Sequence, residues 1–299
     1  MIRVGTCSWT EKSLIQSKEF YPKGVNTAEE RLRYYADRFD VVEVDSSFYA
    51  IPSENTVSLW LERTPPGFTF HIKAFALLTG HSADLKALPP EVRDLLPVES
   101  LTTNRVAVKE KEPLEAAFRL FKAVCEPLRL SGKMGIVVFQ YPPFVIHKKQ
   151  NLDYILFCKE MMDGFSMGIE FRHGSWLERN NRDSVFRFLR EHQLTYIAAD
   201  EPQYGTLATV PFVPEVTTDI AYFRFHGRNK EMWLKKGVET SLRYDYLYSD
   251  QELEEFVPPL SSTDQKAKVT YAMFNNCHGA SATRNALRLK ETVKRKDQI

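Results

Sequence analysis

Charged side chains alternate with apolar ones in two short segments that have the composition of buried strands. In "VVEVDSSF" (residues 41–48), Glu43 and Asp45 lie two positions apart among valines, and His71 and Lys73 have the same spacing in "FTFHIKAF". On a β-strand, residues two apart point to one face. A charge buried in a dry interior costs several kcal/mol unless it is paired. These pairs therefore indicate either an ion-pair network or a site for a polar ligand.

Polar groups also end the other apolar segments. Glu170 and Arg172 have the two-residue spacing in "SMGIEFRH", and Arg224 and His226 have it in "IAYFRFHG". A ring of ionisable groups at one end of a fold is typical of a site for a small polar ligand. The remaining polar or aromatic groups at segment ends are Ser8, Trp9, Gln140, His173, Asp200, Asn275 and Asn276.

Eight apolar segments carry these groups, and most are followed by an amphipathic helical pattern. Strands that alternate with helices favour a parallel sheet, and eight of them predict closure into a TIM (β/α)8 barrel, an α/β fold, as a single domain over 1–299. A doubly wound open sheet shares the alternation, but no GxGxxG turn follows the first segment. Active sites of such barrels lie at the carboxyl ends of the strands, so the polar groups are expected to converge there. The segments are residues 2–9, 41–48, 68–75, 133–142, 166–173, 194–200, 220–227 and 268–276.

The helical segments between the strands carry their own start signals. Thr27 with Glu30 three residues later forms a capping box, and Ser249 is expected to cap a later helix. Residues 201–219 contain at most a short helix. The longest insertion, 79–112, lies between the third strand and its helix, where a barrel places loops on the catalytic face. It is either a lid or specificity loop or a plain surface excursion.

The overall composition excludes some functional classes. Lys and Arg number 40 and Asp and Glu 39 among 299 residues, which gives no support for a nucleic-acid or membrane-surface binder. The four cysteines form no CxxC pair, and with no signal-peptide pattern they favour reduced thiols in the cytoplasm. No apolar run approaches the roughly 18–20 residues of a membrane span. The oligomeric state is not indicated.

The leading hypothesis is an enzyme, such as a hydrolase or an isomerase, that acts on a small polar metabolite, either phosphorylated or sugar-like. Glu170 or Glu43 is expected to act as general acid or base, with a pKa set by burial beside Arg or Lys, and His226 to shuttle protons. An interior closed by mutual ion pairs would contradict this assignment. The expected substrate-binding groups are Lys73, Arg172 and Arg224 for anionic parts, and Asn275 and Asn276 for orientation.

A purely structural network is the alternative explanation of the same residues. In it, Glu43 pairs with Lys73 on the next strand, and Glu170 pairs with Arg172 or Arg224. Such pairs would hold a barrel in register without performing chemistry. A purely structural interior, however, is normally built from Val, Ile and Leu, so a ligand site is favoured.

Four further residues have weaker support. Trp9 and Trp176 are candidates to stack on a base or a sugar ring, although a buried tryptophan more often belongs to a core. Gly279 and Ser281 lie at the start of a helix after the eighth strand. Free N–H groups there suit a phosphate, or Ser281 is an ordinary N-cap.

Several motifs together resemble one known family, the YecE-like proteins (domain of unknown function 72), over nearly the whole chain. The resemblance implies a TIM barrel and places Tyr49 among the substrate-binding groups; the family name assigns no activity. The chain departs from the family at Cys7 and at Asp45, where Asn is common, which adds a carboxylate at the mouth. The motifs are "GTCSW", "VVEVDSSFYAIPSENTVSLWLERTPPGFTFHIKA", "GIVVFQYPPF", "GIEFRHGSW", "AYFRFHGRN" and "YAMFNNCHGASATRNAL". The family's signature positions are Glu43, Ser47, Tyr49, Lys73, Gln140, Glu170, Arg172, His173, Trp176, Arg224, His226, Asn275 and Asn276.

Three other functions remain open. A metal-dependent phosphoester hydrolase would take His and carboxylate ligands from several strands, but there is no HExxH or compact ligand spacing. No cofactor is expected, since P-loop, Rossmann and flavin signatures are absent. A glycosidase needs two carboxylates about 5–10 Å apart, and Glu43 and Glu170 come from nearly opposite strands. A non-catalytic ligand- or nucleic-acid-binding barrel is the third, although the basic "ETVKRKDQI" end is too short to indicate a nucleic-acid surface.

Overall fold

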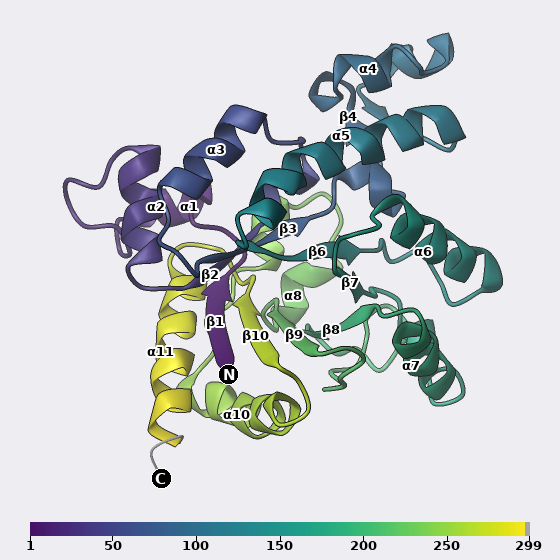
Figure 1. Cartoon of the computed structure of the whole chain (residues 1–299). Helices are drawn as coiled ribbons and strands as arrows, with labels where there is room; N and C mark the ends of the chain where they lie inside the picture. Colours follow the sequence, from purple (N-terminus) through teal and green to yellow (C-terminus); the bar gives the residue numbers. More distant parts are fainter. Residues whose placement is uncertain (297–299) are drawn as a thin grey trace.

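Eight parallel strands close into a barrel in this computed structural model, which describes residues 1–296 (Figure 1). Apart from β4 and β5 in the insertion, each strand lies beside its neighbour in the chain, and β10 closes the barrel against β1. The predicted TIM barrel is therefore confirmed, and each of the eight predicted segments contributes one strand. The strands are β1 (Ile2–Thr6), β2 (Val41–Val44), β3 (Thr69–Lys73), β6 (Met134–Gln140), β7 (Met167–Glu170), β8 (Thr195–Asp200), β9 (Ile220–Phe225) and β10 (Val269–Phe274).

Alternation along the strands divides the barrel interior into an apolar base and a polar upper layer. Val41 on β2 and Tyr222 on β9 belong to an apolar cluster. Glu43 and Arg224 lie two residues further along the same strands and are completely buried. Because a two-residue step keeps the same face, these charged groups form the next layer toward the carboxyl ends of the strands. We call this end of the barrel the mouth.

His71 belongs to the base and not to the mouth. A Cβ at Gly135 would lie 2.3 Å from its Nδ1, so only glycine leaves room for the imidazole. That nitrogen accepts a hydrogen bond from the N–H of Ile136 at 3.0 Å, and the ring packs edge-on against Tyr222 and Tyr271. Burial lowers the pKa of His71 to about 3, so it is a neutral packing residue at physiological pH.

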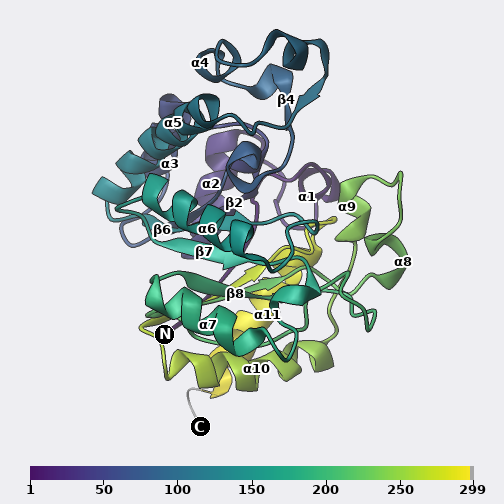
Figure 2. The ribbon, with the colours of Figure 1, turned by 90° about the vertical axis from the view of Figure 1, so that its right-hand side faces the viewer.

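Helices surround the barrel, as Figure 2 shows. Both expected caps form: Thr27 and Glu30 make a capping box, and Ser249 makes another with Glu252. Residues 201–219 contain no helix, as expected. The helices are α1 (Lys12–Ser17), α2 (Ala28–Ala36), α3 (Glu54–Glu62), α5 (Lys111–Leu130), α6 (Lys149–Met161), α7 (Arg182–Glu191), α10 (Asp250–Asp264) and α11 (Ser281–Lys296). No helix within residues 1–296 is both long and apolar enough to cross a lipid bilayer.

The 79–112 insertion folds as a small unit against α5. Its ribbon of β4 (Ala83–Asp84) and β5 (Arg105–Val106) is antiparallel, and α4 (Pro90–Arg93) packs on α5. Figure 2 shows α4 and β4 above α5, away from α8 and α9. Its predicted role as a lid stays a prediction. The remaining short turns of the chain are η1 (Asp45–Phe48), η2 (Ala76–Thr79), η3 (Leu85–Ala87), η4 (Val98–Thr102) and η5 (Gly174–Trp176).

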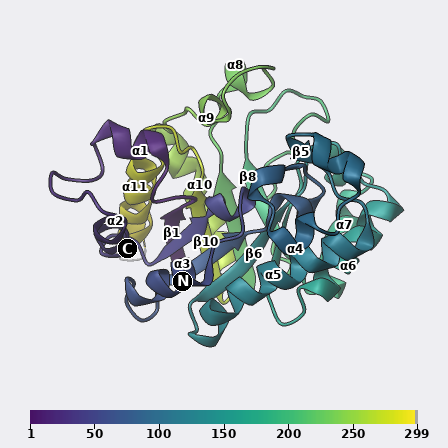
Figure 3. The same ribbon diagram turned by 90° about the horizontal axis from the view of Figure 1, so that it is seen from above.

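The connection between β9 and α10 covers part of the mouth instead. It contains two short helices, α8 (Lys230–Trp233) and α9 (Thr240–Arg243). Figures 2 and 3 both show them at one end of the barrel, beyond the strands. This segment and the carboxyl ends of the strands enclose the candidate site.

Candidate functional site

A completely buried arginine, Arg224 of β9, lies between two glutamates. Its Nε and Nη2 donate to the carboxylate of Glu43 at 3.1 and 2.7 Å, and its Nη1 donates to Glu170 at 2.5 Å. The hydroxyl of Tyr222 also donates to Glu43, at 2.8 Å. Because β2, β7 and β9 are not adjacent in the barrel, these bonds cross its interior and join three parts of its wall.

A second arginine, Arg172, extends this arrangement to the mouth. Its Nε lies 2.5 Å from Glu170, and its Nη1 donates to Glu201 at 2.6 Å. The result is an alternating series of buried charges, Glu43, Arg224, Glu170, Arg172 and Glu201, which we call the charge ladder. The prediction that Glu170 pairs with Arg172 or Arg224 is confirmed, since it pairs with both.

The predicted pair between Glu43 and Lys73 does not form. Lys73 instead donates to Asp45 at 2.7 Å, and Asp45 lies 3.6 Å from Arg224. Arg224 occupies both carboxylate oxygens of Glu43. The planar guanidinium can bind a carboxylate through two parallel bonds, which the ammonium of Lys73 cannot do.

Glu43 and Glu170 also lie closer together than expected for residues on nearly opposite strands of the barrel. Both carboxylates contact the same guanidinium, that of Arg224. Long side chains on opposite walls therefore meet at the centre of an eight-stranded barrel. The guanidinium fills the space between the two carboxylates, where a glycosidase would need the scissile bond.

Two groups of the network, Glu170 and His226, hold fixed protonation states, whereas burial raises the pKa of Glu43 against the opposing effect of Arg224. Burial alone would raise the pKa of Glu170, but Arg172 and Arg224 outweigh it and hold this pKa well below its usual range. Burial and Arg172 lower the pKa of His226 well below its usual value. Neutral His226 can donate from Nε2 to Glu170 at 3.1 Å while its Nδ1 accepts from Asn275 at 2.9 Å, and these bonds assign its tautomer.

The three residues expected to be catalytic are therefore sealed within the protein. Glu43, Glu170 and His226 each have no solvent-exposed surface, and each is bonded to a neighbour in the network. An interior closed by mutual ion pairs would contradict their assignment as catalytic groups, and such pairs surround Glu43 and Glu170. Their direct exchange of a proton with a substrate stays a prediction, and their geometry favours a role in positioning Arg172.

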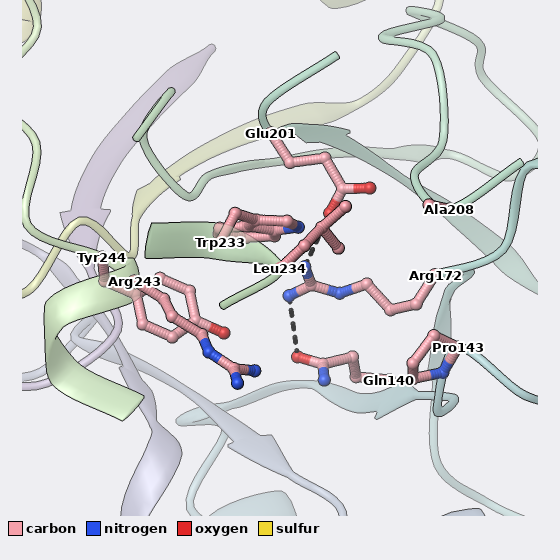
Figure 4. Close-up of a pocket in the computed structure, with 9 residues that line it drawn as sticks. All are labelled: Gln140, Pro143, Arg172, Glu201, Ala208, Trp233, Leu234, Arg243 and Tyr244. Atoms are coloured by element: carbon pink, nitrogen blue, oxygen red, sulfur yellow. Dashed lines mark hydrogen bonds and ion pairs between the residues drawn. The ribbon is translucent and has the colours of Figure 1, made fainter. Parts of the chain in front are cut away.

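The open end of the charge ladder lines a cavity of about 180 Å³, which we call the arginine pocket. In Figure 4 the guanidinium groups of Arg172 and Arg243 point into the same space, beside Gln140 and Tyr244. Arg172 also lies 5.4 Å from the ring centre of Trp233. The pocket is lined by Gln140, Pro143, Arg172, Glu201, Ala208, Trp233, Leu234, Arg243 and Tyr244.

Glu201 is the carboxylate of the ladder that lines a cavity, and about 1% of its side chain is exposed. One of its oxygens accepts from Arg172, and the other accepts from the N–H of Val210 at 2.8 Å. Burial raises the pKa of Glu201 to about 7, against the opposing effect of Arg172. A group with a pKa near the working pH is well suited to accept and return a proton.

This raised pKa predicts a pH-dependent stability that depends on Glu201. Between the usual glutamate pKa of 4.5 and about 7, the folded protein keeps a proton that the unfolded chain has released. Raising the pH through that window therefore lowers the free energy of unfolding, by on the order of 3 kcal/mol in total, and the loss levels off above pH 7. Urea denaturation between pH 4.5 and 8 should show a flatter profile for Glu201→Gln. Exposed Glu291→Gln is the control, and an unchanged profile in Glu201→Gln would contradict the raised pKa.

A second cavity, of about 160 Å³, lies beside the first and shares Tyr244 with it. We call it the hydroxyl-lined pocket. It contains the Lys73–Asp45 ion pair and the side chains of Ser8, Tyr49 and Asn275, so five of the predicted binding residues meet here. It is lined by Cys7, Ser8, Asp45, Tyr49, Lys73, Thr240, Ser241, Tyr244, Asn275 and Cys277.

Two predicted stacking residues lie in apolar packing. Trp9 packs edge-on against Trp60 of α3 at 5.7 Å. Trp176 stacks on Phe171 at 4.2 Å and donates its Nε1–H to the carbonyl of Val145 at 2.7 Å. Their contact with a ligand stays a prediction without support from this geometry.

Three other predicted binding residues hold loops. Asp200 accepts from Arg228 at 3.0 Å and from Tyr248 at 2.6 Å. Asn276 donates to the carbonyl of Tyr246 at 2.8 Å. His173 bonds Ser175 two residues later. These bonds anchor the loops around the mouth, and a ligand contact for these residues stays a prediction.

The predicted phosphate position at the start of α11 is already occupied by protein groups. The N–H of Gly279 donates to the hydroxyl of Ser13 at 2.7 Å, and that hydroxyl donates in turn to Glu11. The cavity there measures only about 10 Å³. A phosphate at Gly279 and Ser281 stays a prediction, and the nearby carboxylate disfavours it.

Sequence patterns did not identify Glu201, Trp233, Arg243 and Tyr244. A signal was present for Glu201, because it directly follows Asp200 at the end of a strand, and consecutive residues point to opposite sides. The other three lie in "RNKEMWLKKGVETSLRYDY" (228–246), a basic and aromatic connection with no strand-like alternation. Their position over the mouth depends on how this connection folds.

The geometry gives no support to the metal-dependent alternative. Within residues 1–296, no group of three or more His, Cys, Asp or Glu side chains is arranged to hold a metal ion. The carboxylates at the mouth are instead paired with Arg172, Arg224 and Lys73.

Comparisons with known proteins agree with this fold and assign the family. The sequence pattern described as "Protein of unknown function DUF72" matches residues 3–299. UPF0759 protein YunF of Bacillus subtilis (strain 168) is 31% identical over 297 residues, covering 98% of this chain and 95% of that protein. A DUF72 family crystal structure from Enterococcus faecalis V583 has a TM-score of 0.80 at 27% identity, covering 98% of this chain and 96% of its own. One from Thermotoga maritima MSB8 has a TM-score of 0.78 at 29% identity, covering 98% and 99%. The chain therefore belongs to the DUF72 family.

Proposed function

We propose that this protein is an enzyme that performs acid–base chemistry on a small anionic metabolite at the barrel mouth. Arg172 and Arg243 hold the anionic group of the substrate, and Glu201 exchanges a proton with it. The observation that carries the proposal is that the residues lining a single cavity of about 180 Å³ include two arginines and one glutamate, Glu201.

Arg243 supports the anion-binding role because its hydrogen-bonding capacity is not used up. Its Nη2 donates to the carbonyl of Lys235 at 3.1 Å. Its Nε is buried and has no hydrogen-bond partner within residues 1–296. Leaving a buried donor unsatisfied costs about 1–3 kcal/mol, which an anionic ligand would recover through charge-assisted bonds.

The buried ladder supports the role of Glu201. Arg172 is held in place by Glu170, which stays ionised, and by Gln140, whose Oε1 accepts from its Nη2 at 3.2 Å. A guanidinium fixed in this way stabilises negative charge without moving during the reaction. All four cysteines are free thiols, which supports the expectation that the enzyme works in the reducing cytoplasm.

Anion binding tests the proposal through Arg243. Inorganic phosphate and acetate, titrated separately at low ionic strength, should raise the melting temperature of the wild-type protein. Arg243→Gln should weaken the binding by about 10- to 100-fold, because it removes a charged hydrogen-bond donor worth about 1.5–3 kcal/mol.

The control is Lys236→Gln, which removes a positive charge from an exposed position of the same connection. It should change the affinity little. The proposal is wrong if neither anion binds, or if the two variants weaken binding equally.

A further inference from the structure

The two cavities at the mouth lie over one continuous hydrogen-bonded floor. Arg224 donates to Gln140 of the arginine pocket at 3.1 Å and lies 3.6 Å from Asp45 of the hydroxyl-lined pocket. His226 bonds Asn275 of the second pocket and lies 3.1 Å from Arg172 of the first. At the floor of the mouth, the guanidinium of Arg224 therefore separates the two cavities.

One segment also covers both cavities. Thr240 and Ser241 of α9 line the hydroxyl-lined pocket, Arg243 at the end of the same helix lines the arginine pocket, and Tyr244 lines both. Because a four-residue helix moves as one unit, a ligand in either cavity contacts the same covering element.

The two cavities differ in chemistry. The arginine pocket contains two guanidinium groups against one carboxylate, Glu201. In the hydroxyl-lined pocket the charges of Lys73 and Asp45 balance at 2.7 Å. The other groups that can form hydrogen bonds are hydroxyls, an amide and, more weakly, the thiols of Cys7 and Cys277. Such groups recognise neutral hydroxyls, since each can donate or accept.

The ion pair in the second pocket keeps bonding capacity for a ligand. Lys73 and Arg224 both approach Oδ1 of Asp45, at 2.7 and 3.6 Å. Within residues 1–296, Oδ2 of Asp45 accepts no hydrogen bond, so it can accept one from a ligand hydroxyl. The ammonium of Lys73 carries three N–H donors, and one of them is used by Asp45.

We infer that the substrate has two parts: an anionic group in the arginine pocket and a polyhydroxylated carbon chain or ring in the hydroxyl-lined pocket. This inference rests on the proposed function and adds the class of substrate, a sugar phosphate or a sugar acid. A carboxylate and a phosphate share the chemistry that two guanidinium groups recognise, so the experiment tests both.

Matched probes separate the two parts of the ligand. The two-part probes are D-glucose 6-phosphate and D-gluconate, and the single-part probes are inorganic phosphate, acetate and D-glucose, all titrated calorimetrically at one low ionic strength. At least one two-part probe should bind the wild-type protein about tenfold or more tightly than its anion alone, since two or three neutral hydrogen bonds supply that difference. Tighter binding of D-glucose 6-phosphate identifies the anionic group as a phosphate, and tighter binding of D-gluconate identifies it as a carboxylate.

Two variants assign the parts to the two cavities. Thr240→Val with Ser241→Ala removes two hydroxyls from a short helix at the mouth; it should abolish the tenfold advantage and leave the affinity for phosphate or acetate unchanged. Arg243→Gln should weaken both the two-part probe and its anion. Melting temperatures without ligand check that each variant folds.

The possible failures can be distinguished. If both two-part probes bind no more tightly than their anions while Arg243→Gln still weakens anion binding, the two-part substrate is wrong and the anion site stands. The inference is also wrong if the double variant keeps the full advantage. If no anion binds the wild-type protein, the proposed function fails and the inference fails with it.

Discussion

Replacing Arg224 by methionine is expected to lower the free energy of unfolding by about 3–5 kcal/mol, the usual effect of removing one partner from a buried ion pair. The variant removes the cation that Glu43 and Glu170 share, and both carboxylates are completely buried. Glu170 keeps its pair with Arg172, whereas Glu43 loses the guanidinium that binds both of its oxygens. Urea denaturation at pH 7 measures the loss.

A compensated variant separates lost pairing from lost packing. Adding Glu43→Gln to Arg224→Met removes the carboxylate that has lost its cation, so part of the stability should return; Glu170 keeps its pair with Arg172 in both variants. This double variant also keeps the test informative if Arg224→Met does not fold. Arg33→Met, which removes an exposed pair with Glu29, should cost only about 0.3–0.5 kcal/mol. An equal cost for Arg224→Met and Arg33→Met would show that the charge ladder does not stabilise the barrel.

Replacing Glu201 by glutamine is expected to lower the turnover of the substrate by about 10²- to 10⁴-fold, the usual contribution of a general acid or base. The amide keeps the volume of the side chain while the exchangeable proton is lost. Its single oxygen can accept from Arg172 or from the N–H of Val210, which bind different oxygens of Glu201, so the melting temperature of Glu201→Gln checks that the pocket stays folded. Incubation of a small-metabolite extract with wild-type enzyme, followed by mass spectrometry, should reveal compounds that are consumed. These compounds should persist with Glu201→Gln and disappear with the control Glu291→Gln.

The pH dependence of the same assay adds an independent check. If Glu201 exchanges the proton, the rate of the wild-type enzyme should change around pH 7, where this group titrates. Consumption by Glu201→Gln at the wild-type rate would remove Glu201 from the mechanism. Anion binding through Arg243 would then be the surviving part of the proposal.

Much of the fold and part of the site could be predicted from local patterns. The two-residue spacing of Glu43 and Asp45 showed which side of β2 carries charge, because alternation depends on the strand alone. The count of strand–helix units predicted closure, and closure carries the charged strand ends to a common mouth. Lys73 and Arg172 were recognised for the same reason, and both line a cavity.

The pairing of the charges could not be predicted in the same way. Lys73 was expected to bind Glu43 because β2 and β3 are neighbours, but Arg224 reaches across the barrel and binds both oxygens of Glu43. The choice depends on side-chain length and on the small diameter of the closed barrel. Those distances exist only in the folded protein, and so does the close approach of Glu43 and Glu170.

The amino-acid sequence by itself determined the barrel, its charged upper layer and the family to which the chain belongs, because strand alternation and helix caps depend on residues near one another in the chain. Tertiary structure alone decided which buried charges line a cavity and which do not. Glu43 and Glu170 lie beneath Arg172, whereas Glu201 lies beside a cavity. It also placed Arg243 and Tyr244 over the mouth, since a connection without alternation takes its position from what it packs against. The burial of a side chain depends on all the elements around it, so a local sequence pattern cannot predict it.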